Sequence, residues 1–299
     1  MTNAVAPELH EIEQLATEIA GRAGDMLRDR FRSAIEVRFK DQRGLDPVTD
    51  ADHAVEAMVR AAVHARFPTH ALLGEEGDDS GPPDADYVWV VDPLDGTANF
   101  VNGLPLFSCS IGVVHRGEPV VGAIWASTGR RLQPGVYHAA RGGGLRFDGV
   151  PVPYAPLEVD QPNRLSALPG GVIGVTGPRG RRFGIARTLG SIALELALTA
   201  DGSFRYCVIG DGKIWDVAAG VALCLAAGVQ ISAKPVEGGW RSLERFIPGE
   251  TAPSVATLRD WREKIVVGDP AVVPEMARDL AREQGRLGSL RRLFFGSES

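Results

Sequence analysis

The chain has 299 residues, 44% of them hydrophobic, so it can bury a large core as one large domain or two closely packed halves. Its formal net charge of −6 argues against a nucleic-acid-binding surface, which normally carries a basic excess. No stretch approaches the roughly 20 apolar residues that cross a bilayer, and Met1 to Pro7 lacks the pattern of a secretory signal. Three scattered cysteines imply neither a metal site nor a disulfide framework. We therefore expect a cytoplasmic protein with no nucleic-acid or membrane partner.

The N-terminal region predicts two helices that pack on a core. Segments 8–32 and 51–67 carry apolar residues at helical spacing, and the alternating segment 35–39 predicts a half-exposed strand between them. Thr49 and Asp52 lie at the start of the second helix. Helix capping is enough to explain these two residues, so a role in a site needs support from other segments.

Two short apolar segments each end in acidic residues. Residues 71–73 predict a strand that ends at Gly74-Glu75-Glu76, and Trp89 to Val91 predict a strand that stops at Asp92-Pro93, because proline lacks a backbone donor. Asp95, Gly96 and Thr97 follow at once. Carboxylates favour hard cations such as Mg²⁺ or Mn²⁺, and amide groups at a helix start favour phosphate. The alternative is that the dipeptides Asp92-Pro93 and Asp95-Gly96 only mark turns.

Further along, the pattern predicts antiparallel strands and then a second half. The predicted strands are 108–114, 119–125 and 136–139. A change of composition at 151–162 indicates halves 1–150 and 151–299, which we expect to pack as one compact unit.

The second half is predicted to hold short strands and three helices. The predicted strands are 165–167, 171–175 and 204–209, and the predicted helices are 188–200, 217–227 and 272–293. Asp216 precedes the second of these helices, where it can serve as a helix cap or as part of a site. The arginine-rich last helix predicts a surface or oligomer contact. Arg179, Arg181, Arg182 and Arg187 form either a solvated face or a rim that attracts anions.

Four acidic segments together resemble a known family. Asp92 to Thr97, Gly74 to Glu76 and Trp215 to Gly220 are similar to the three signature segments of the inositol monophosphatase family of Mg²⁺-dependent phosphatases. Asp46 to Asp52 resembles the acidic segment that this family carries near its N-terminus. The likeness runs from about the first helix to about residue 230. It implies a mixed α/β fold, a layered αβαβα sandwich, and commonly a homodimer.

The resemblance also implies roles for individual residues. Two or three Mg²⁺ ions, or Mn²⁺, would be held by carboxylates and one carbonyl. The implied ligands are Glu75, Asp92 and the Leu94 carbonyl for one ion, and Asp92, Asp95 and Asp216 for another. Asp52 and Thr97, with Glu75, would orient the attacking water and take its proton. The Gly96 and Thr97 amides, with Asp95 and Asp216, would contact the substrate, and Lys40 resembles a loop lysine near the site.

The implied activity is Mg²⁺-dependent hydrolysis of a small phosphate monoester, inositol monophosphate or a related metabolite. In inositol-specific members a glutamate six residues before the tryptophan of the third motif contacts a sugar hydroxyl, whereas this chain has Ile209 there. Ile192 also replaces a smaller residue near the pocket. Histidinol phosphate, fructose 1,6-bisphosphate, a nucleoside 3',5'-bisphosphate and NADP are therefore alternative substrates. A non-catalytic protein that binds metal or a phosphorylated metabolite is the alternative of another class.

Overall fold

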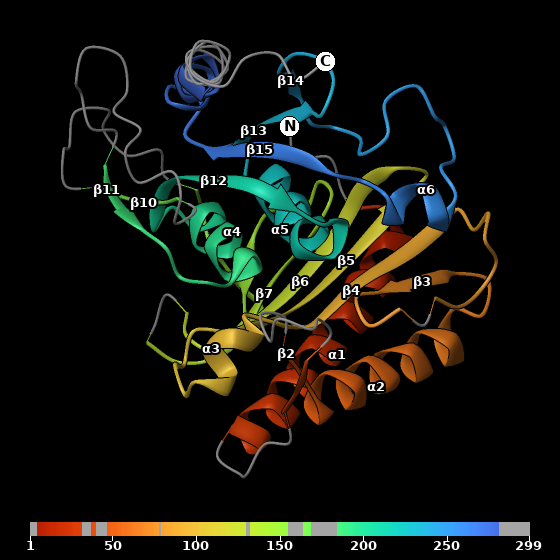
Figure 1. Ribbon diagram of the computed structural model, residues 1–299. Helices are drawn as coiled ribbons and strands as arrows, with labels where there is room; N and C mark the ends of the chain where they lie inside the picture. The colour runs from red at the N-terminus through yellow and green to blue at the C-terminus, as the bar shows by residue number, and fades with distance from the viewer. Residues whose placement is uncertain are drawn as a thin grey trace, which may run out of the picture.

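We describe a computed structural model, which covers residues 5–31, 37–39, 47–77, 79–129, 132–154, 164–168 and 184–280 (Figure 1). For residues 37–39, 47 and 48 only the backbone is described. The predicted strand 171–175, Lys40, Asp46 and three of the four clustered arginines, Arg179, Arg181 and Arg182, lie outside the described residues.

The elements of the first half alternate helices with strands and then continue as a run of strands. They are α1 (Pro7–Phe31), β1 (Val37–Phe39), β2 (Pro47–Thr49), α2 (Asp50–Arg66), β3 (Ala71–Gly74), β4 (Tyr87–Asp95), α3 (Thr97–Val101), β5 (Ser108–His115), β6 (Glu118–Ala126), β7 (Gly135–Ala140), β8 (Arg146–Phe147) and β9 (Val150–Pro151).

The second half mixes strands and helices. Its elements are β10 (Leu165–Ala167), β11 (Ile185–Arg187), α4 (Ile192–Ala200), β12 (Phe204–Gly212), α5 (Ile214–Ala226), β13 (Gln230–Pro235), β14 (Arg241–Ser242), α6 (Val255–Arg259) and β15 (Glu263–Gly268). Residues 273–280 are also helical.

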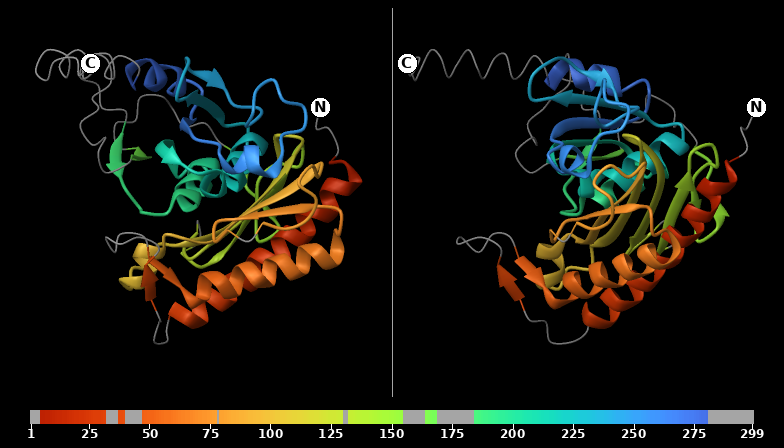
Figure 2. Two further views of the ribbon diagram at one scale, coloured as in Figure 1. Left: turned by 45° about the vertical axis from the view of Figure 1, so that its right-hand side comes forward. Right: turned by 90° about the vertical axis from the view of Figure 1, so that its right-hand side faces the viewer.

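The helices α1 and α2 cover one face of a large sheet. Among the described residues this sheet has the strand order β3-β4-β5-β6-β7-β8-β9, with β3 parallel to β4 and the later neighbours antiparallel. Ile12 of α1 and Val59 of α2 belong to one buried cluster with Trp89 and Ile111 of the sheet. The helical spacing of the two segments thus buries one face of each helix against the sheet, as Figure 2 shows.

A second pair of helices, α4 and α5, fills the space between this sheet and another. The second sheet has the order β11-β10-β12-β15-β13-β14 in the described part of the chain. Val90 of β4, Val217 of α5 and Ile265 of β15 belong to the same buried cluster. Two glycines allow α5 to approach the first sheet closely: a Cβ on Gly122 would lie 2.3 Å from the Ala219 carbonyl oxygen, and one on Gly112 would lie 2.7 Å from the Ala218 Cβ.

The helical residues 273–280 pack on the outer face of the second sheet, where Met276 and Val273 meet Tyr206 and Val266. The order of layers is therefore helix, sheet, helix, sheet, helix, and the predicted αβαβα sandwich is confirmed (Figures 1 and 2). No helix among the described residues has the length and apolar character that crossing a membrane requires.

Three predicted boundaries were wrong. Strand β4 does not end at Asp92-Pro93 but continues to Asp95, because its pairing with β5 shifts register between Asp92 and Asp95 and then resumes. Helix α4 starts at Ile192 instead of residue 188, since Gly190 has a positive φ of 76° and Ser191 caps the helix. Helix α5 starts at Ile214, so Asp216 lies in its first turn.

Candidate active site

Strand β4 brings Asp92 next to Glu75. Asp92 is buried, with 2% of its surface exposed, and its Oδ1 accepts a hydrogen bond of 3.0 Å from the Leu94 N–H. The Glu75 N–H donates to the Val91 carbonyl at 3.0 Å, which extends the parallel pairing of β3 and β4 by one residue. Glu75 therefore follows β3, and Asp92 lies near the carboxyl end of the neighbouring parallel strand β4, at the same edge of the sheet.

Asp95 is held by residues from two distant segments. Its Oδ2 accepts hydrogen bonds from the Ser191 hydroxyl at 2.6 Å, the Ala193 N–H at 2.6 Å and the Ser108 hydroxyl at 3.2 Å. Its Oδ1 accepts from the Ile192 N–H at 3.2 Å. Asp95 thus binds the first N–H groups of α4, which have no partner inside the helix and attract negative charge. This contact ties the first half of the chain to the second.

Asp216 and Asp52 occupy the same position in two different helices. Asp216 is the third residue of α5, and its Oδ2 accepts a hydrogen bond of 2.7 Å from the Lys213 N–H. Asp52 is the third residue of α2, and its Oδ2 accepts from the Thr49 N–H at 2.8 Å and from the Thr49 hydroxyl at 2.6 Å. Both aspartates therefore have the capping function that the sequence offered as the alternative to a site.

The carboxylates interact electrostatically as one cluster. Burial raises the pKa of Asp92 well above its usual range, and repulsion from Glu75, Asp95 and Asp216 adds to that rise. Burial also raises the pKa of Asp216 to about 7, with repulsion from Asp95 as the next cause. The pKa of Asp52 is raised by burial, although its bonds from Thr49 act in the opposite direction. Charged carboxylates this close are destabilised by one another unless positive charge joins them.

The chemistry of this donor set fits a hard cation. All the grouped side chains offer carboxylate oxygen, the ligand type that Mg²⁺ takes in proteins. In the described part of the chain, no three acidic, histidine or cysteine side chains already stand at metal-ligand spacing. The physical reason is visible for Asp95 and Asp216, whose oxygens are turned toward backbone N–H groups. An ionised carboxylate has about four lone-pair sites, so Asp216, which accepts one such bond, keeps capacity for a cation, whereas Asp95 accepts four bonds and would exchange some of them for a cation.

Gly96 and Thr97 form the turn between β4 and α3. Gly96 has φ of 93°, which favours glycine, and a Cβ there would lie 3.1 Å from the Leu106 carbonyl and 3.2 Å from the Gly190 carbonyl. The Thr97 hydroxyl donates a hydrogen bond of 2.8 Å to the Leu94 carbonyl. The close approach of Leu106 and Gly190 therefore leaves no space for a side chain at this turn, which directly follows Asp95.

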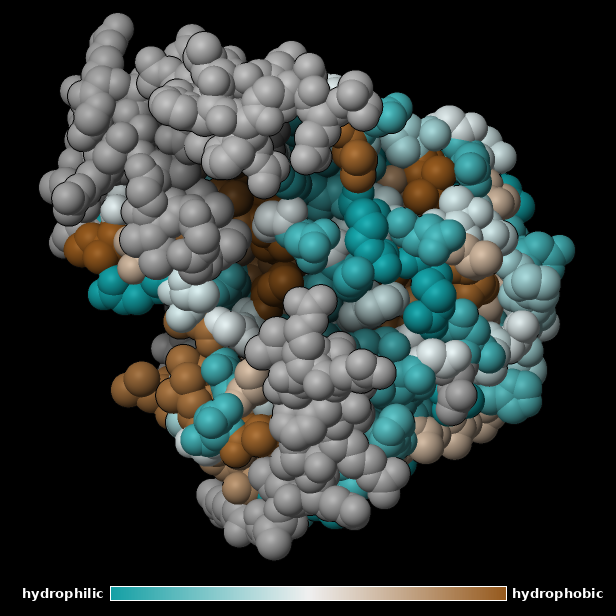
Figure 3. Space-filling view, in the orientation of Figure 1, coloured by the Kyte–Doolittle hydropathy of each residue, from teal (hydrophilic) through white to brown (hydrophobic). Residues whose placement is uncertain are grey.

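Ile209 is a core residue, with 3% of its surface exposed. Its side chain is buried in the core between the sheets, and its Cα partner on β15 is Ile265. Asp211, two residues later, is exposed. The space-filling view shows hydrophilic residues gathered beside a hollow with hydrophobic residues in it (Figure 3).

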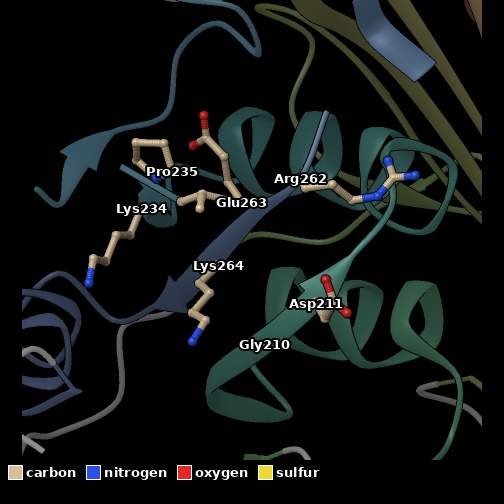
Figure 4. Close-up of a pocket in the computed structure, with 8 residues that line it drawn as sticks. Gly210, Asp211, Lys234, Pro235, Arg262, Glu263 and Lys264 are labelled. Atoms are coloured by element: carbon tan, nitrogen blue, oxygen red, sulfur yellow. The ribbon is translucent and has the colours of Figure 1, made fainter. Parts of the chain in front are cut away.

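A cavity of about 270 Å³ lies beside the end of β12, with Asp211, Lys234, Arg262 and Lys264 among its lining residues. Figure 4 shows the ammonium groups of Lys234 and Lys264 pointing one way and the Glu263 carboxylate pointing the other. None of the acidic residues predicted from the four motifs lines this cavity.

Several residues of the site were missed by sequence reasoning. Ser108 and Ser191 both contact Asp95, and Glu56 of α2 accepts a hydrogen bond of 3.0 Å from the Glu76 N–H. Ser191 precedes an apolar helical segment, so its capping role was visible in the pattern. The pattern did not indicate the contact of Ser191 with Asp95, because this contact joins residues far apart in the chain.

Comparisons with known proteins identify the family and the fold that this chain resembles. Residues 8–266 match a family model described as the inositol monophosphatase family. An inositol-1-monophosphatase of Rhizobium meliloti is 32% identical over 243 residues, covering 75% of this chain and 85% of that protein. The Nus factor SuhB of Pseudomonas aeruginosa is 33% identical over 243 residues, covering 73% of this chain and 83% of that protein. A structure described as an IMPase/NADP phosphatase complexed with Mg²⁺ and phosphate superposes with a TM-score of 0.69 at 18% identity, covering 91% of this chain and 96% of that one, which shows a shared fold.

Proposed function

This chain belongs to the inositol monophosphatase family, and from that membership we propose that it hydrolyses a small phosphate monoester in a Mg²⁺-dependent reaction. Members of the family are metal-dependent phosphatases, that is, phosphoric monoester hydrolases. The observation that carries the proposal is that Asp92 lies buried among Glu75, Asp95 and Asp216, so that burial first and their repulsion second raise its pKa. Such a cluster is costly to the fold without a cation, so its presence favours metal-assisted chemistry.

The proposed ligands come from both halves of the chain. Glu75, Asp92 and the Leu94 carbonyl would hold one Mg²⁺, and Asp92, Asp95 and Asp216 another; two or three ions in all, Mg²⁺ or Mn²⁺, are proposed. When bound, these ions supply the charge that activates water and stabilises the leaving oxygen. Residues 1–150 and residues 151–299 would then be two parts of one catalytic unit.

Asp52 and Thr97 are the residues that we assign to the attacking water. The Asp52 carboxylate is fixed by its two bonds from Thr49, so it can keep one orientation while it accepts a proton. The Thr97 hydroxyl is fixed on the Leu94 carbonyl and leaves its oxygen as an acceptor for water. The Gly96 and Thr97 N–H groups would hold phosphate oxygens, and Asp95 and Asp216 the substrate.

The residue at position 209 leaves the substrate open among several phosphate esters. A buried isoleucine cannot accept a hydrogen bond from a polyol hydroxyl, and a site without that acceptor would leave a substrate hydroxyl unpaired. The proposed substrates to test are therefore inositol monophosphate and, as alternatives, histidinol phosphate, fructose 1,6-bisphosphate, a nucleoside 3',5'-bisphosphate and NADP. The proposed setting is a cytoplasmic homodimer that binds a small phosphorylated metabolite, without nucleic acid or membrane.

The deciding experiment is phosphate release from this panel with Mg²⁺, Mn²⁺ or EDTA, with and without Li⁺. Asp95→Asn is the test variant, and Asp211→Asn is the matched control because Asp211 is an exposed aspartate outside the cluster. We expect one ester to be hydrolysed with Mg²⁺ by the wild type and the control but not by Asp95→Asn. Turnover that persists in EDTA, or that Asp95→Asn retains, would contradict the proposal.

A second candidate is a non-catalytic regulator, favoured by the 33% identity to a protein named Nus factor SuhB. The same panel separates the two candidates. Mg²⁺ binding with no phosphate release from any ester would favour the regulator.

A further inference from the structure

Arg259, at the end of α6, contacts the backbone of the turn that carries Glu75. Its Nη2 donates a hydrogen bond of 2.6 Å to the Gly74 carbonyl. The same guanidinium forms two hydrogen bonds with Asp79, one of them 3.0 Å from Nε to Oδ2. The fork of the guanidinium therefore holds both ends of the segment from Gly74 to Asp79.

The same arginine also reaches the turn that carries Asp216. Its guanidinium carbon lies 5.4 Å from the centre of the Trp215 ring, a distance at which a cation is attracted to an aromatic face. The Trp215 carbonyl is tied to β5 by a 3.2 Å hydrogen bond from the Ser110 hydroxyl. Trp215 is the residue before Asp216, and Gly74 is the residue before Glu75. Arg259 therefore contacts the residue that precedes each of two proposed ligands.

Arg262 lies over the same tryptophan ring and is bonded to the backbone of Arg259. Its guanidinium carbon lies 5.7 Å from the Trp215 ring centre, and its Nη1 donates to the Arg259 carbonyl at 2.8 Å. Figure 4 shows its guanidinium turned away from Lys234 and Lys264.

The Glu75 turn is braced from its other side by α2. Glu56 accepts hydrogen bonds from the Glu76 N–H at 3.0 Å and from Arg60 Nη2 at 2.7 Å. A Cβ on Gly74 would lie 2.4 Å from the Glu56 carboxyl, so the turn fits closely against this side chain. The contacts with Glu56 of α2 thus fix the place of the Glu75 turn. The link from this turn to the second half of the site comes from Arg259 of α6.

We infer that Arg259 is a positioning residue for the acidic cluster, which fixes the turn of Glu75 relative to the turn of Asp216. The inference rests on the proposed function, because it concerns the two residues that we assign to different ions. Arg259 contacts Gly74 and Trp215, so its effect on the two turns passes through these residues. Residues that orient ligands in this way typically change metal affinity by about 10-fold to 100-fold when they are removed.

The test compares Arg259→Ala and Arg259→Lys with Arg116→Ala. Arg116 forms the same type of bidentate pair, with Asp86, at 2.8 Å and 3.2 Å on an exposed surface of the first half, so it is a matched control. Mn²⁺ binding is measured by electron paramagnetic resonance, and turnover of the best ester is measured against Mg²⁺ concentration. Thermal unfolding in EDTA reports the effect on the fold.

We expect Arg259→Ala to weaken Mn²⁺ binding and to raise the Mg²⁺ concentration for half-maximal turnover about 10-fold or more. Excess Mg²⁺ should restore most of kcat, which a general loss of folding would not allow. Arg259→Lys should recover part of the affinity, because one ammonium can bond to Gly74 or Asp79 but cannot reproduce the fork. Arg116→Ala should leave both metal measurements unchanged.

Wild-type affinity in both Arg259 variants, or an equal loss in Arg116→Ala, would overturn the positioning role. If Arg259→Ala does not fold, Arg259→Lys and Asp79→Asn carry the same test. A wild type that binds Mn²⁺ but hydrolyses no ester would contradict the phosphatase proposal, while the binding data would still decide the role of Arg259. A wild type that binds no divalent cation would contradict both.

Discussion

Ser191 donates a 2.6 Å hydrogen bond to Asp95, although 96 positions of the chain separate them. The same hydroxyl caps α4 by accepting from the Leu194 N–H. One side chain therefore both begins a helix of the second half and holds an acidic residue of the first. Helix capping and the geometry of the proposed metal site are coupled at this point.

Ser191→Ala should lower the free energy of unfolding by about 2 kcal/mol, because it removes a helix cap and a hydrogen bond to a carboxylate. Ser254→Ala is the control, since Ser254 caps α6 through a 3.1 Å bond from the Thr257 N–H without such a contact, and it should cost about 1 kcal/mol. Denaturant unfolding gives both values. Equal losses would mean that the bond to Asp95 contributes nothing.

Gly96→Ala should reduce both stability and phosphate release. The left-handed backbone costs a non-glycine residue about 1 to 2 kcal/mol, and the new Cβ would press on the Leu106 and Gly190 carbonyls. Gly103→Ala is the matched control, because Gly103 has φ of 73° but a Cβ added there would meet no atom within 4 Å. Denaturant unfolding and kcat should show a larger loss at Gly96, and similar losses would refute the role of crowding.

Glu195 should make the protein less stable as the pH rises toward neutrality. Burial raises its pKa to about 7 in the fold, whereas an unfolded glutamate has a pKa of about 4.3. The folded state then binds more protons between these values, so the free energy of unfolding falls across that window and levels off above it. Glu195→Gln should flatten this slope in denaturant unfolding from pH 4 to 8.

The exposed Glu244→Gln serves as the control for that pH series and should leave the slope as it is in the wild type. The amide can still accept the 2.7 Å bond that the Leu189 N–H donates to Glu195 Oε1. A wild-type slope in Glu195→Gln would show that other groups cause the dependence.

Asp216→Asn should have opposite effects with and without metal. At pH 8 in EDTA it should raise the unfolding temperature, because it removes one of the repelling charges, and its amide oxygen can still accept from the Lys213 N–H. Mg²⁺ should stabilise the wild type by about 2.7 kcal/mol at 100 times its Kd, and the variant by less. Asp211→Asn should behave as the wild type in thermal unfolding under both conditions. No stabilisation of the wild type by Mg²⁺ would count against the metal site.

The sequence by itself determined the elements with strong local signals. The spacing of apolar residues predicted α1 and α2 to within one residue or so, and the acidic motifs identified Glu75, Asp92, Asp95 and Asp216 as one candidate set. These features are local, because helical periodicity and short motifs are written in neighbouring residues.

Only the tertiary structure decided which residues surround that set. The register shift that carries β4 through Pro93 depends on β5, and the start of α4 at Ile192 depends on Gly190 and Ser191. The contacts of Ser191 with Asp95 and of Arg259 with Gly74 join segments 96 and 185 positions apart. Such contacts arise when layers pack, and packing between distant segments leaves no periodic trace in the sequence.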